Sequence, residues 1–362
     1  MGIDPAFWAG KRVLVTGNTG FKGSWLTLCL LQLGAEVHGL APGAPTDPSL
    51  YDLAGLAADV PQAAIDIRDY DAVLATVRDA RPDVVIHMAA QPIVRESFIT
   101  PRETYEVNVM GTVNILDAVR VAGDSVQAVV NVTSDKCYEN REWEWGYRED
   151  EPMGGYDPYS NSKGCSELVT SAFRQSFFGD SGAAHVASVR AGNVIGGGDW
   201  AADRLIPDIM RATLGGEAVP IRRPDAIRPW QHVLNPLSGY LEVAAQMCDD
   251  PSLATAFNVG PDDADTRPVQ WLVKQIDARW PDPIKWNIDP GPHPHEATFL
   301  KLDSGRAKAR LGWTPNWGLA DGLDAIVEWY LALRDGQSIH DTTLAQIQRF
   351  VSTYDNSHRS SA

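Results

Sequence analysis

The segment Arg12-Val13-Leu14-Val15-Thr16-Gly17-Asn18-Thr19-Gly20-Phe21-Lys22-Gly23 decides the fold. Its first five residues are a short apolar run that predicts a buried strand, and residues 24–33 predict a helix. The glycines between them permit a tight turn and a close approach of the backbone to a pyrophosphate, and the helix N-terminus offers free N–H groups. Because the turn follows the first strand, the segment indicates a dinucleotide-binding βα unit rather than an ordinary βα loop. Its spacing is G-x-x-G-x-x-G.

The residues after this segment continue the alternation of strand and helix. Apolar runs of strand length lie at 36–40, 63–67, 83–88, 128–133 and 187–191. Helical spacing of apolar residues lies at 70–80 and 101–122. This alternation predicts an α/β fold with a parallel, doubly wound sheet. A last strand at 256–260 should return to the sheet, and 319–334 should be a terminal amphipathic helix.

Strict alternation stops after residue 191. We therefore expect two domains. Residues 1–191, with about 232–260, should form the dinucleotide-binding domain. Residues 192–231 and 261–362 should form a smaller mixed α/β domain over the strand ends, where it would hold the substrate.

The composition excludes several classes of partner. The chain has 362 residues, 44% of them hydrophobic, and a net charge of −16, which argues against a nucleic-acid surface and an anionic membrane. The four cysteines show neither metal-ligand spacing nor a dense disulfide pattern, so we expect no metal site and a reducing, cytoplasmic compartment. Residues 1–12 do not resemble a signal peptide, and 25–33 is too short to span a bilayer.

Two groups of polar residues should carry the chemistry. Ser134-Asp135-Lys136 follows a central strand, and open α/β sheets bind ligands at the carboxyl ends of their strands. Tyr159 and Lys163 are four positions apart in a segment that Asp157 can cap as a helix, so both can face one cleft. An ammonium group near the phenol should lower its pKa and make Tyr159 a general base. Taken alone, the Tyr159–Lys163 spacing more often means two polar residues on a solvated helix, and Ser134-Asp135-Lys136 could be a loop entrance with capping side chains.

Candidate ligand contacts lie at other strand ends. Asp66 could accept a hydrogen bond from an adenine amine, and Ala89 and Ala90 would let a cofactor lie close to the backbone. The second strand runs into Ala41-Pro42-Gly43 rather than an acidic residue, so the sequence leaves NAD and NADP as alternatives. An arginine cluster in an acidic chain suits a diphosphate. Its members are Arg204, Arg211, Arg222, Arg223 and Arg228.

With these residues placed, the chain resembles the extended short-chain dehydrogenase/reductase family almost from end to end. The most specific segments are 16–25, 133–143, 154–163 and 227–232. Within the family it is similar to the branch that dehydrates CDP-glucose, because Lys136 stands where the dTDP-glucose branch usually has glutamate. Asn18 departs from the histidine that is usual in the phosphate turn. The resemblance implies a Rossmann-type sheet, a homodimer built on helices 101–122 and 157–177, and a hydro-lyase that uses tightly bound NAD.

The resemblance also implies roles for individual residues. Tyr159 would be the base at the C4 hydroxyl, Lys163 would hold the nicotinamide ribose, and Ser134 would bind the C4 oxygen. Asp135 would protonate the leaving C6 hydroxyl, and Lys136 would act either as the base at C5 or as an ammonium that stabilises the enolate. The implied cofactor contacts are Gly17, Thr19, Gly20, Phe21, Gly23, Asp66, Ile67, Ala89, Ala90, Gln91, Asn108, Thr133, Tyr159 and Lys163. The expected substrate contacts are Asn193, Arg204, Arg211 and Arg228.

Three alternatives remain at this point. A dehydratase for a dTDP- or GDP-linked sugar would use the same chemistry. A nucleotide-sugar 4-epimerase would share Tyr159 and Lys163 but would not need an acid and an amine beside Ser134. A non-catalytic NAD-binding regulator would be expected to lose Tyr159, Lys163 or Asp135, and this chain keeps all three.

Overall fold

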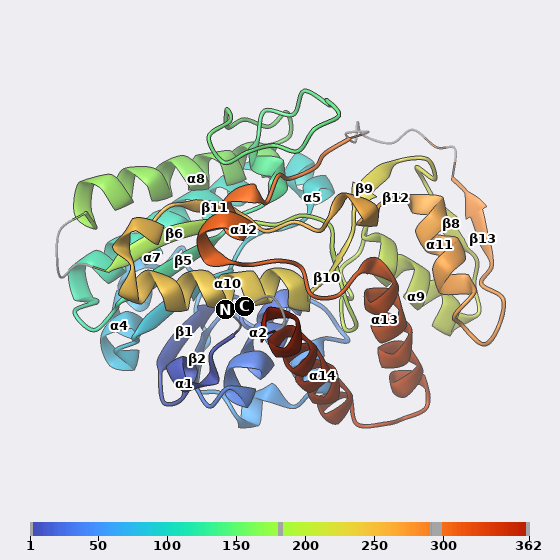
Figure 1. Cartoon of the computed structure of the whole chain (residues 1–362), viewed down its shortest axis with the longest axis horizontal. Coiled ribbons are helices and arrows are strands. Elements are labelled where there is room, and N and C mark those ends of the chain that lie inside the picture. The colour runs from blue at the N-terminus through green and yellow to red at the C-terminus, as the bar shows by residue number, and fades with distance from the viewer. Residues whose placement is uncertain (1–2, 180–183, 290, 292–298, 360–362) are drawn as a thin grey trace.

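A seven-stranded parallel sheet forms the centre of the molecule (Figure 1). The computed structural model describes residues 3–179, 184–289, 291 and 299–359. The strands, in their order across the sheet, are β11 (Ala256–Asn258), β6 (His185–Arg190), β5 (Ala128–Val132), β4 (Val84–His87), β1 (Arg12–Thr16), β2 (Glu36–Leu40) and β3 (Gln62–Ala63). All neighbouring pairs are parallel. The predicted doubly wound sheet is confirmed. The chain adds β2 and β3 on one side of β1, and then adds β4 and the later strands on its other side.

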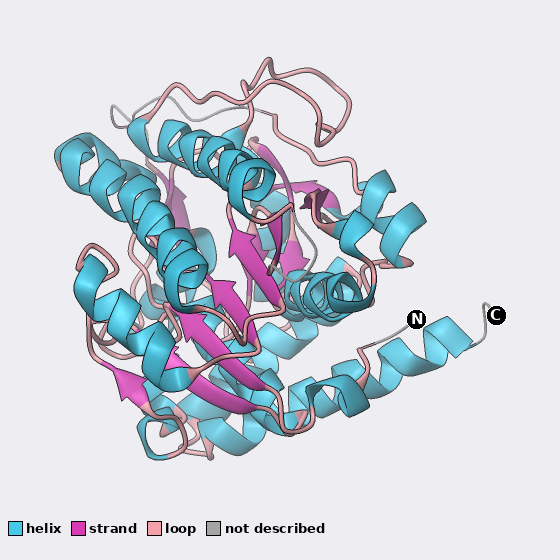
Figure 2. Cartoon of the chain, turned by 90° about the vertical axis from the view of Figure 1, so that its left-hand side faces the viewer, coloured by secondary structure: helices cyan, strands magenta, loops and turns pink. Residues whose placement is uncertain are grey.

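Helices cover both faces of this sheet (Figure 2). Because successive strand residues point to opposite faces, Val13 and Val15 enter one core and Leu14 enters the other. The core around Leu14 is closed by α4 (Tyr70–Ala80), α7 (Gly111–Ala122) and α8 (Pro158–Phe177). The larger core is closed by α2 (Phe21–Gln32) and α10 (Leu234–Asp249).

Several predicted elements have slightly different bounds in the structure, and three of these differences bear on the site. Helix α2 begins at Phe21, three residues before the predicted start, directly from the glycine turn. Strand β3 ends at Ala63, so residues 64–67 leave the sheet. The helix predicted at 101–122 is a continuous helical run in three parts: α6 (Pro101–Tyr105), the π-helical turn η2 (Glu106–Met110) and α7. Such π turns occur most often at functional sites, and this one carries Asn108.

The remaining elements build a smaller mixed region beyond the strand ends. Its strands pair as β7 (Val194–Ile195) with β10 (Gln231–His232), β8 (Val219–Ile221) with β13 (Trp286–Ile288), and β9 (Ile227–Pro229) with β12 (Thr266–Pro268). Its helices are α9 (Leu205–Gly215), α11 (Val269–Asp277) and α13 (Leu319–Arg334). The short helices elsewhere are α1 (Pro5–Trp8), α3 (Leu50–Leu53), α5 (Val94–Ile99) and α12 (Gly305–Leu311).

A final helix, α14 (Ile339–Arg359), packs back on the Rossmann part of the chain (Figure 1). Tyr354 donates a hydrogen bond of 2.6 Å to the buried Glu242 of α10, and Gln348 reaches Gln32 of α2 at 3.5 Å. The sequence prediction ended at residue 334 and did not include this helix. Within the described ranges, no helix combines the length and the apolar character needed to cross a membrane.

Candidate active site

The glycine turn after β1 is packed closely against the protein's own backbone. Gly17 has φ +71°, and a Cβ there would lie 2.8 Å from the backbone of Ala89. A Cβ at Gly23 would collide with the backbone of residues 17 and 18. Gly20 precedes α2 without a side-chain cap. The N-terminus of α2 therefore presents N–H groups beside a compact turn, which fits the pyrophosphate of a dinucleotide.

Polar side chains fix this turn to the neighbouring strand ends. Asn18 is fully buried and donates to Gln62 at 2.7 Å, and Thr19 donates to the carbonyl of Gly43 at 2.6 Å. Asn18 therefore uses its amide N–H within the protein. The departure from the family's histidine thus gives a turn that is held by its own hydrogen bonds.

The other candidate cofactor residues lie at the carboxyl ends of β3, β4 and β5. Asp66 forms an ion pair with Arg68 at 2.6 Å, which lowers the pKa of its carboxyl despite partial burial. Ile67 packs against Gly111 of α7. Ala89, Ala90 and Gln91 follow β4, and Thr133 follows β5.

Asn108 holds the segment after β4 in place. Its side-chain oxygen accepts from the backbone N–H of Gln91 at 2.8 Å, and its amide donates to the Gln91 carbonyl at 3.1 Å and to Ser162 at 2.9 Å. The π turn thus ties the cofactor-facing end of β4 to α8. Asn108 acts in this structure as a brace between two candidate site segments.

Ser134 and Asp135 form a compact pair at the end of β5. The Ser134 hydroxyl donates to Asp135 Oδ1 at 3.0 Å, and Asn193 Nδ2 lies 3.4 Å from Oδ2. Asp135 is 2% exposed, and its burial raises the pKa of the carboxyl against the opposing charges of Lys136 and Arg228. A carboxyl with a raised pKa is suited to donate a proton. A Cβ at residue 192 would overlap this carboxyl, so Gly192 makes room for it.

Tyr159 and Lys163 stand on α8, where Asp157 caps the helix by accepting from the N–H of Ser160 at 2.9 Å. Burial raises the pKa of Tyr159 to about 12, although the hydroxyl of Ser134 and the charge of Arg204 favour the phenolate. The expected lowering of the tyrosine pKa was wrong for this structure, because desolvation outweighs the hydrogen bond of Ser134 and the charge of Arg204. Burial also lowers the pKa of Lys163 to about 8, and its Nζ lies 3.4 Å from the carbonyl of Val132.

Lys22 is a further cation that the sequence analysis missed. Its pKa is lowered to about 7 by burial and by the positive charges of Lys163 and Arg204, and its Nζ lies 5.8 Å from the centre of the Tyr240 ring. Lys22 is the second residue of α2, and apart from its place in the glycine turn no sequence pattern marks it as a site residue. Lys136, in contrast, is exposed, so the protein does not bury it as a neutral lysine base would require.

The predicted substrate residues do not all reach the catalytic group. Arg228 acts electrostatically on Asp135, and Arg204 acts on Tyr159 while it pairs with the buried Asp199 at 3.1 Å. Arg211 instead contacts Asp208 at 3.0 Å and the carbonyl of Trp200 at 2.7 Å. The structure thus brings Arg204 and Arg228 toward the strand-end group and directs Arg211 elsewhere.

Two other features bear on what the site can contain. His87 is a buried core residue with a pKa lowered to about 3 by desolvation, and its ring contacts Thr16 at 2.7 Å and Thr112 at 3.4 Å. Among the residues that the structure describes, no cluster of histidine, cysteine and acidic side chains could hold a metal ion. All four cysteines are free thiols.

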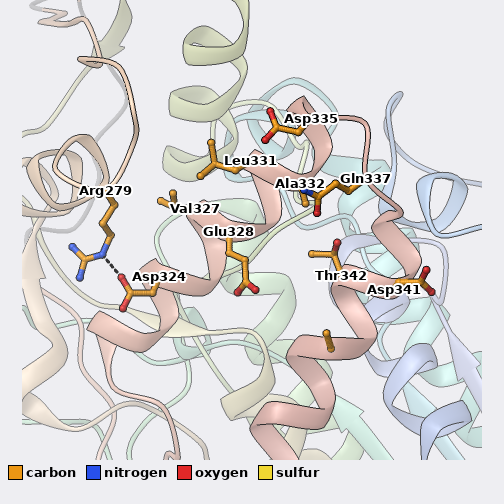
Figure 3. Close-up of a pocket in the computed structure, with 11 residues that line it drawn as sticks. Arg279, Asp324, Val327, Glu328, Leu331, Ala332, Asp335, Gln337, Asp341 and Thr342 are labelled. Carbon is orange, nitrogen blue, oxygen red and sulfur yellow. Dashed lines mark hydrogen bonds and ion pairs between the residues drawn. The ribbon is translucent and has the colours of Figure 1, made fainter.

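A groove of about 720 Å³ lies away from these residues, between α13 and α14 (Figure 3). Its walls carry the carboxylates of Asp324, Glu328, Asp335 and Asp341, and Arg279 pairs with Asp324 at 2.6 Å. None of the candidate cofactor, catalytic or substrate residues lines it. We therefore place the active site at the strand ends and not in this groove.

The fold and the strand-end residues fit the class of enzymes that modify nucleotide sugars. The chain belongs to the family described as GDP-mannose 4,6 dehydratase, whose model matches residues 14–326. One relative shares about half of the sequence. The chain is 52% identical over 356 residues to the CDP-glucose 4,6-dehydratase of Salmonella typhimurium, covering 97% of this chain and 99% of that protein. It is also 29% identical to UDP-glucose 4-epimerase 3 of Oryza sativa, covering 86% of this chain and 88% of that one.

Solved structures of the family share the fold. The UDP-glucose 4-epimerase of Thermus thermophilus, solved in complex with NAD, is 26% identical and superposes with a TM-score of 0.74. The match covers 88% of this chain and 99% of that one.

Proposed function

We propose that the protein dehydrates CDP-D-glucose to CDP-4-dehydro-6-deoxy-D-glucose with NAD as a resident cofactor, and is thus a hydro-lyase. The observation that carries this proposal is the 52% identity, over nearly the whole of both chains, to a CDP-glucose 4,6-dehydratase. The buried acid Asp135 beside Ser134, Tyr159 and Lys163 supports dehydration specifically. A 4-epimerase would not need that acid.

The first step is oxidation at C4. Tyr159 would accept the proton of the C4 hydroxyl as a phenolate. Burial, which raises the pKa of Tyr159 to about 12, opposes this form, whereas the Ser134 hydroxyl and the charge of Arg204 favour it. Ser134 would hydrogen-bond the C4 oxygen as it becomes a ketone. Bound NAD would supply the acceptor for the C4 hydride and return that hydride at the end of the reaction. The glycine turn and the N-terminus of α2 would hold its pyrophosphate. Lys163 would hold the nicotinamide ribose.

The second step is loss of water across C5 and C6. The C4 ketone acidifies C5–H, and Asp135, whose raised pKa keeps its proton available, protonates the departing C6 hydroxyl. Lys136 is exposed and is therefore better suited to stabilise the C5 enolate as an ammonium than to act as a neutral base. Asn193, Arg204 and Arg228 would hold the nucleotide diphosphate.

The test is incubation of the purified protein with CDP-glucose, dTDP-glucose and GDP-mannose, followed by alkali to reveal a 4-keto sugar chromophore. We expect turnover of CDP-glucose with a kcat/KM at least about tenfold above that of dTDP-glucose, because a pocket that accepts the cytosine amine leaves a buried acceptor unpaired against thymine, at a cost of about 1–3 kcal/mol. Equal or higher kcat/KM for dTDP-glucose would reject the base assignment. Formation of a 4-epimer without the chromophore would reject dehydration.

The oligomeric part of the proposal is a homodimer. Helices α6, α7 and α8 lie against one another at the surface, and α5 lies beside α6 and α8. Their exposed apolar side chains are Phe98, Ile99, Tyr105, Met110, Val121, Leu168 and Phe177. Side chains of this kind exceed what is needed to cover the sheet, and a second copy would bury them. Light scattering at micromolar concentration should give a dimer, and a monomer would refute it.

Two broader statements belong to the same proposal. Residues 1–191 with about 232–260 would bind NAD, and residues 192–231 and 261–362 would bind the nucleotide sugar. The glycine turn follows β1 of the large sheet and Arg204 precedes α9 of the smaller region, which supports this division, whereas α14 packs on α2 and α10 of the first part. The four free thiols support a cytoplasmic, reducing location.

A further inference from the structure

A buried ion pair lies beneath the strand-end group. The carboxylate of Glu167 accepts hydrogen bonds from Thr133, from Ser188 at 2.7 Å and from Arg190 at 2.7 Å. Glu167 is 4% exposed and Arg190 is 3% exposed. Removing two charges from water is costly unless excellent geometry and further hydrogen bonds compensate for it. The hydroxyls of Thr133 and Ser188 supply those further bonds to the carboxylate.

The network attaches to the catalytic segment at both of its ends. Thr133 immediately precedes Ser134, and Tyr138 follows residues 135–137. Arg190 donates to the hydroxyl of Tyr138 at 2.6 Å, and Tyr138 in turn donates to Asn258 of β11 at 2.7 Å. The loop that carries Ser134, Asp135 and Lys136 is thus tied to α8 at Thr133, and to β6 and β11 at Tyr138.

The same carboxylate faces Lys163. The two residues are four positions apart on α8, so their side chains lie on one face of the helix. The charge of Glu167 raises the pKa of Lys163 against the lowering by burial. The titratable and charged groups that act on this pair come from several elements. Glu167 interacts with Arg190 of β6, with Cys137 after β5 and with Arg174 of α8. Lys163 interacts with Cys137, with Lys22 of α2 and with His87 of β4.

We propose that Glu167 is a positioning residue of the active site. Paired with Arg190, it holds Thr133 and so the Ser134–Lys136 loop, and its negative charge is the counter-charge that keeps Lys163 protonated. This inference rests on the proposed function for the roles of Ser134 and Lys163. It goes beyond that function because Glu167 itself touches neither substrate nor cofactor in the proposed reaction.

The direction of the pH effect follows from the charges. Lys163 has to carry its proton to act as an ammonium, and its pKa is about 8 in the folded protein. Activity that depends on this ammonium is present below that pKa and is lost as the pH rises through it. Without the Glu167 charge, desolvation acts with less opposition and the pKa of Lys163 falls. The alkaline loss of activity should then move to lower pH.

The test compares four variants of the full-length protein. Glu167→Gln removes the charge but keeps the shape, and Glu167→Asp keeps the charge. Ser188→Ala is the matched control, because it removes one hydrogen bond to Glu167 and leaves both charges. Glu167→Gln combined with Arg190→Met removes both charges and keeps the test possible if the single variant does not fold.

The first readout does not depend on catalysis. NMR of protein labelled with ¹³C at lysine Cε follows the titration of Lys163, which a Lys163→Met variant assigns. In Glu167→Gln the midpoint should fall by about one pH unit, the size expected for loss of a close opposite charge. Glu167→Asp should restore most of the shift, and Ser188→Ala should leave the midpoint unchanged. An unmoved midpoint in Glu167→Gln or in the double variant would overturn the proposal.

The second readout is the pH profile of kcat with CDP-glucose. Its alkaline limb should move in the same direction and by a similar amount in Glu167→Gln, with kcat more affected than KM. A variant that is less stable but has the parent profile would show a purely structural residue and would overturn the proposal. If the parent protein does not turn over any nucleotide sugar while the NMR shift is present, the proposed function fails and the electrostatic role of Glu167 stands.

Discussion

Two groups of arginine–carboxylate pairs lie close to the candidate active site, and they differ in burial. Beneath the catalytic loop, Glu167 and Arg190 each have side chains 4% exposed and are held by several hydrogen bonds. Around the segment before α9, Asp203 pairs with Arg222 at 2.7 Å and with Arg95 at 3.2 Å, and these three side chains are 20–35% exposed. The first group is closed to water and the second is open to it.

The difference indicates how the two parts of the site work. A buried, fully bonded pair fixes the Ser134–Lys136 loop before any ligand binds, because breaking it would leave a charge in the protein interior. Ion pairs that are partly exposed, as those of Asp203 are, contribute little to the free energy of folding and can exchange partners. The Ser134–Lys136 loop is therefore pre-organised, whereas we expect the arginines that pair with Asp203 to exchange partners more easily.

The largest expected effect is that of Tyr159→Phe, on the pre-organised side. Removing a positioned base should reduce kcat by on the order of 10²–10⁴-fold. The helix that carries residue 159 is capped by Asp157, so the fold and the affinity for NAD should be nearly unchanged. Circular dichroism and NAD titration provide the control for kcat. If the variant turned over at nearly the rate of the parent protein, Tyr159 would not be the base. The contrast between the buried Glu167–Arg190 pair and the Asp203 pairs would then be weaker.

Asp135→Asn should separate the two chemical steps on that side. Oxidation at C4 depends on Tyr159, but the C6 hydroxyl would lack its proton donor, so overall turnover should fall by about 10²-fold or more. Rapid-scan absorbance should show reduced nicotinamide that forms on mixing and persists. The Nδ2 of Asn193 lies 3.4 Å from Oδ2 of Asp135 and can also hydrogen-bond the amide of an asparagine, so the side chain at residue 135 should keep its position. Unimpaired loss of water in this variant would be incompatible with the proposed acid.

Arg190→Met should reveal the buried pair in stability rather than in chemistry alone. Removing one partner leaves the Glu167 carboxylate uncompensated, and such changes cost about 3–5 kcal/mol. The free energy of unfolding from urea titration measures the loss. Adding Glu167→Gln to the same protein should recover a large part of it, since no buried charge then remains. A loss below about 1 kcal/mol would show that the pair is no more strongly held than a surface pair.

Asp203→Asn should have the smallest effect on stability, below about 1 kcal/mol, because its ion pairs are half-exposed. Its effect should appear in binding instead, as a lower KM for CDP-glucose with kcat nearly unchanged, because Arg222 of the predicted diphosphate-binding arginine cluster loses a competing carboxylate. Steady-state kinetics and urea titration of the same preparation separate the two quantities. An unfolding free energy that falls as far as in Arg190→Met would break the comparison.

Most of the sheet could be predicted because its strands are short apolar runs separated by helical patterns. Strand β2 and helices α4 and α13 have the predicted bounds. The prediction weakened after residue 191, where regular alternation ends, and it named none of the helices α9, α10, α11 and α14. The π turn at 106–110 depends on hydrogen bonds made by Asn108 to distant segments, and no local pattern reports it.

The candidate site was predictable where chemistry follows spacing, as for Tyr159 and Lys163. It was not predictable where burial decides. The phenol of Tyr159 has a raised pKa because it is desolvated, and the sequence analysis considered only its cationic neighbour. Glu167 and Arg190 are 23 positions apart, and each alone resembles an ordinary polar residue of a helix or strand. Their pairing exists only after β5, β6 and α8 have come together.

The position of α14 has a consequence for the order of events during folding. The helix after the phosphate turn, α2, meets α14 through residues that include Gln32 and Gln348, which are 316 positions apart. Contacts at such separation form late, because the entropy of closing a long loop has to be overcome before they stabilise the chain. We therefore expect the flank of α2 that meets α14 to be covered late in the folding reaction. Chaperone dependence and refolding yield should be governed by this delayed closure more than by the sheet itself.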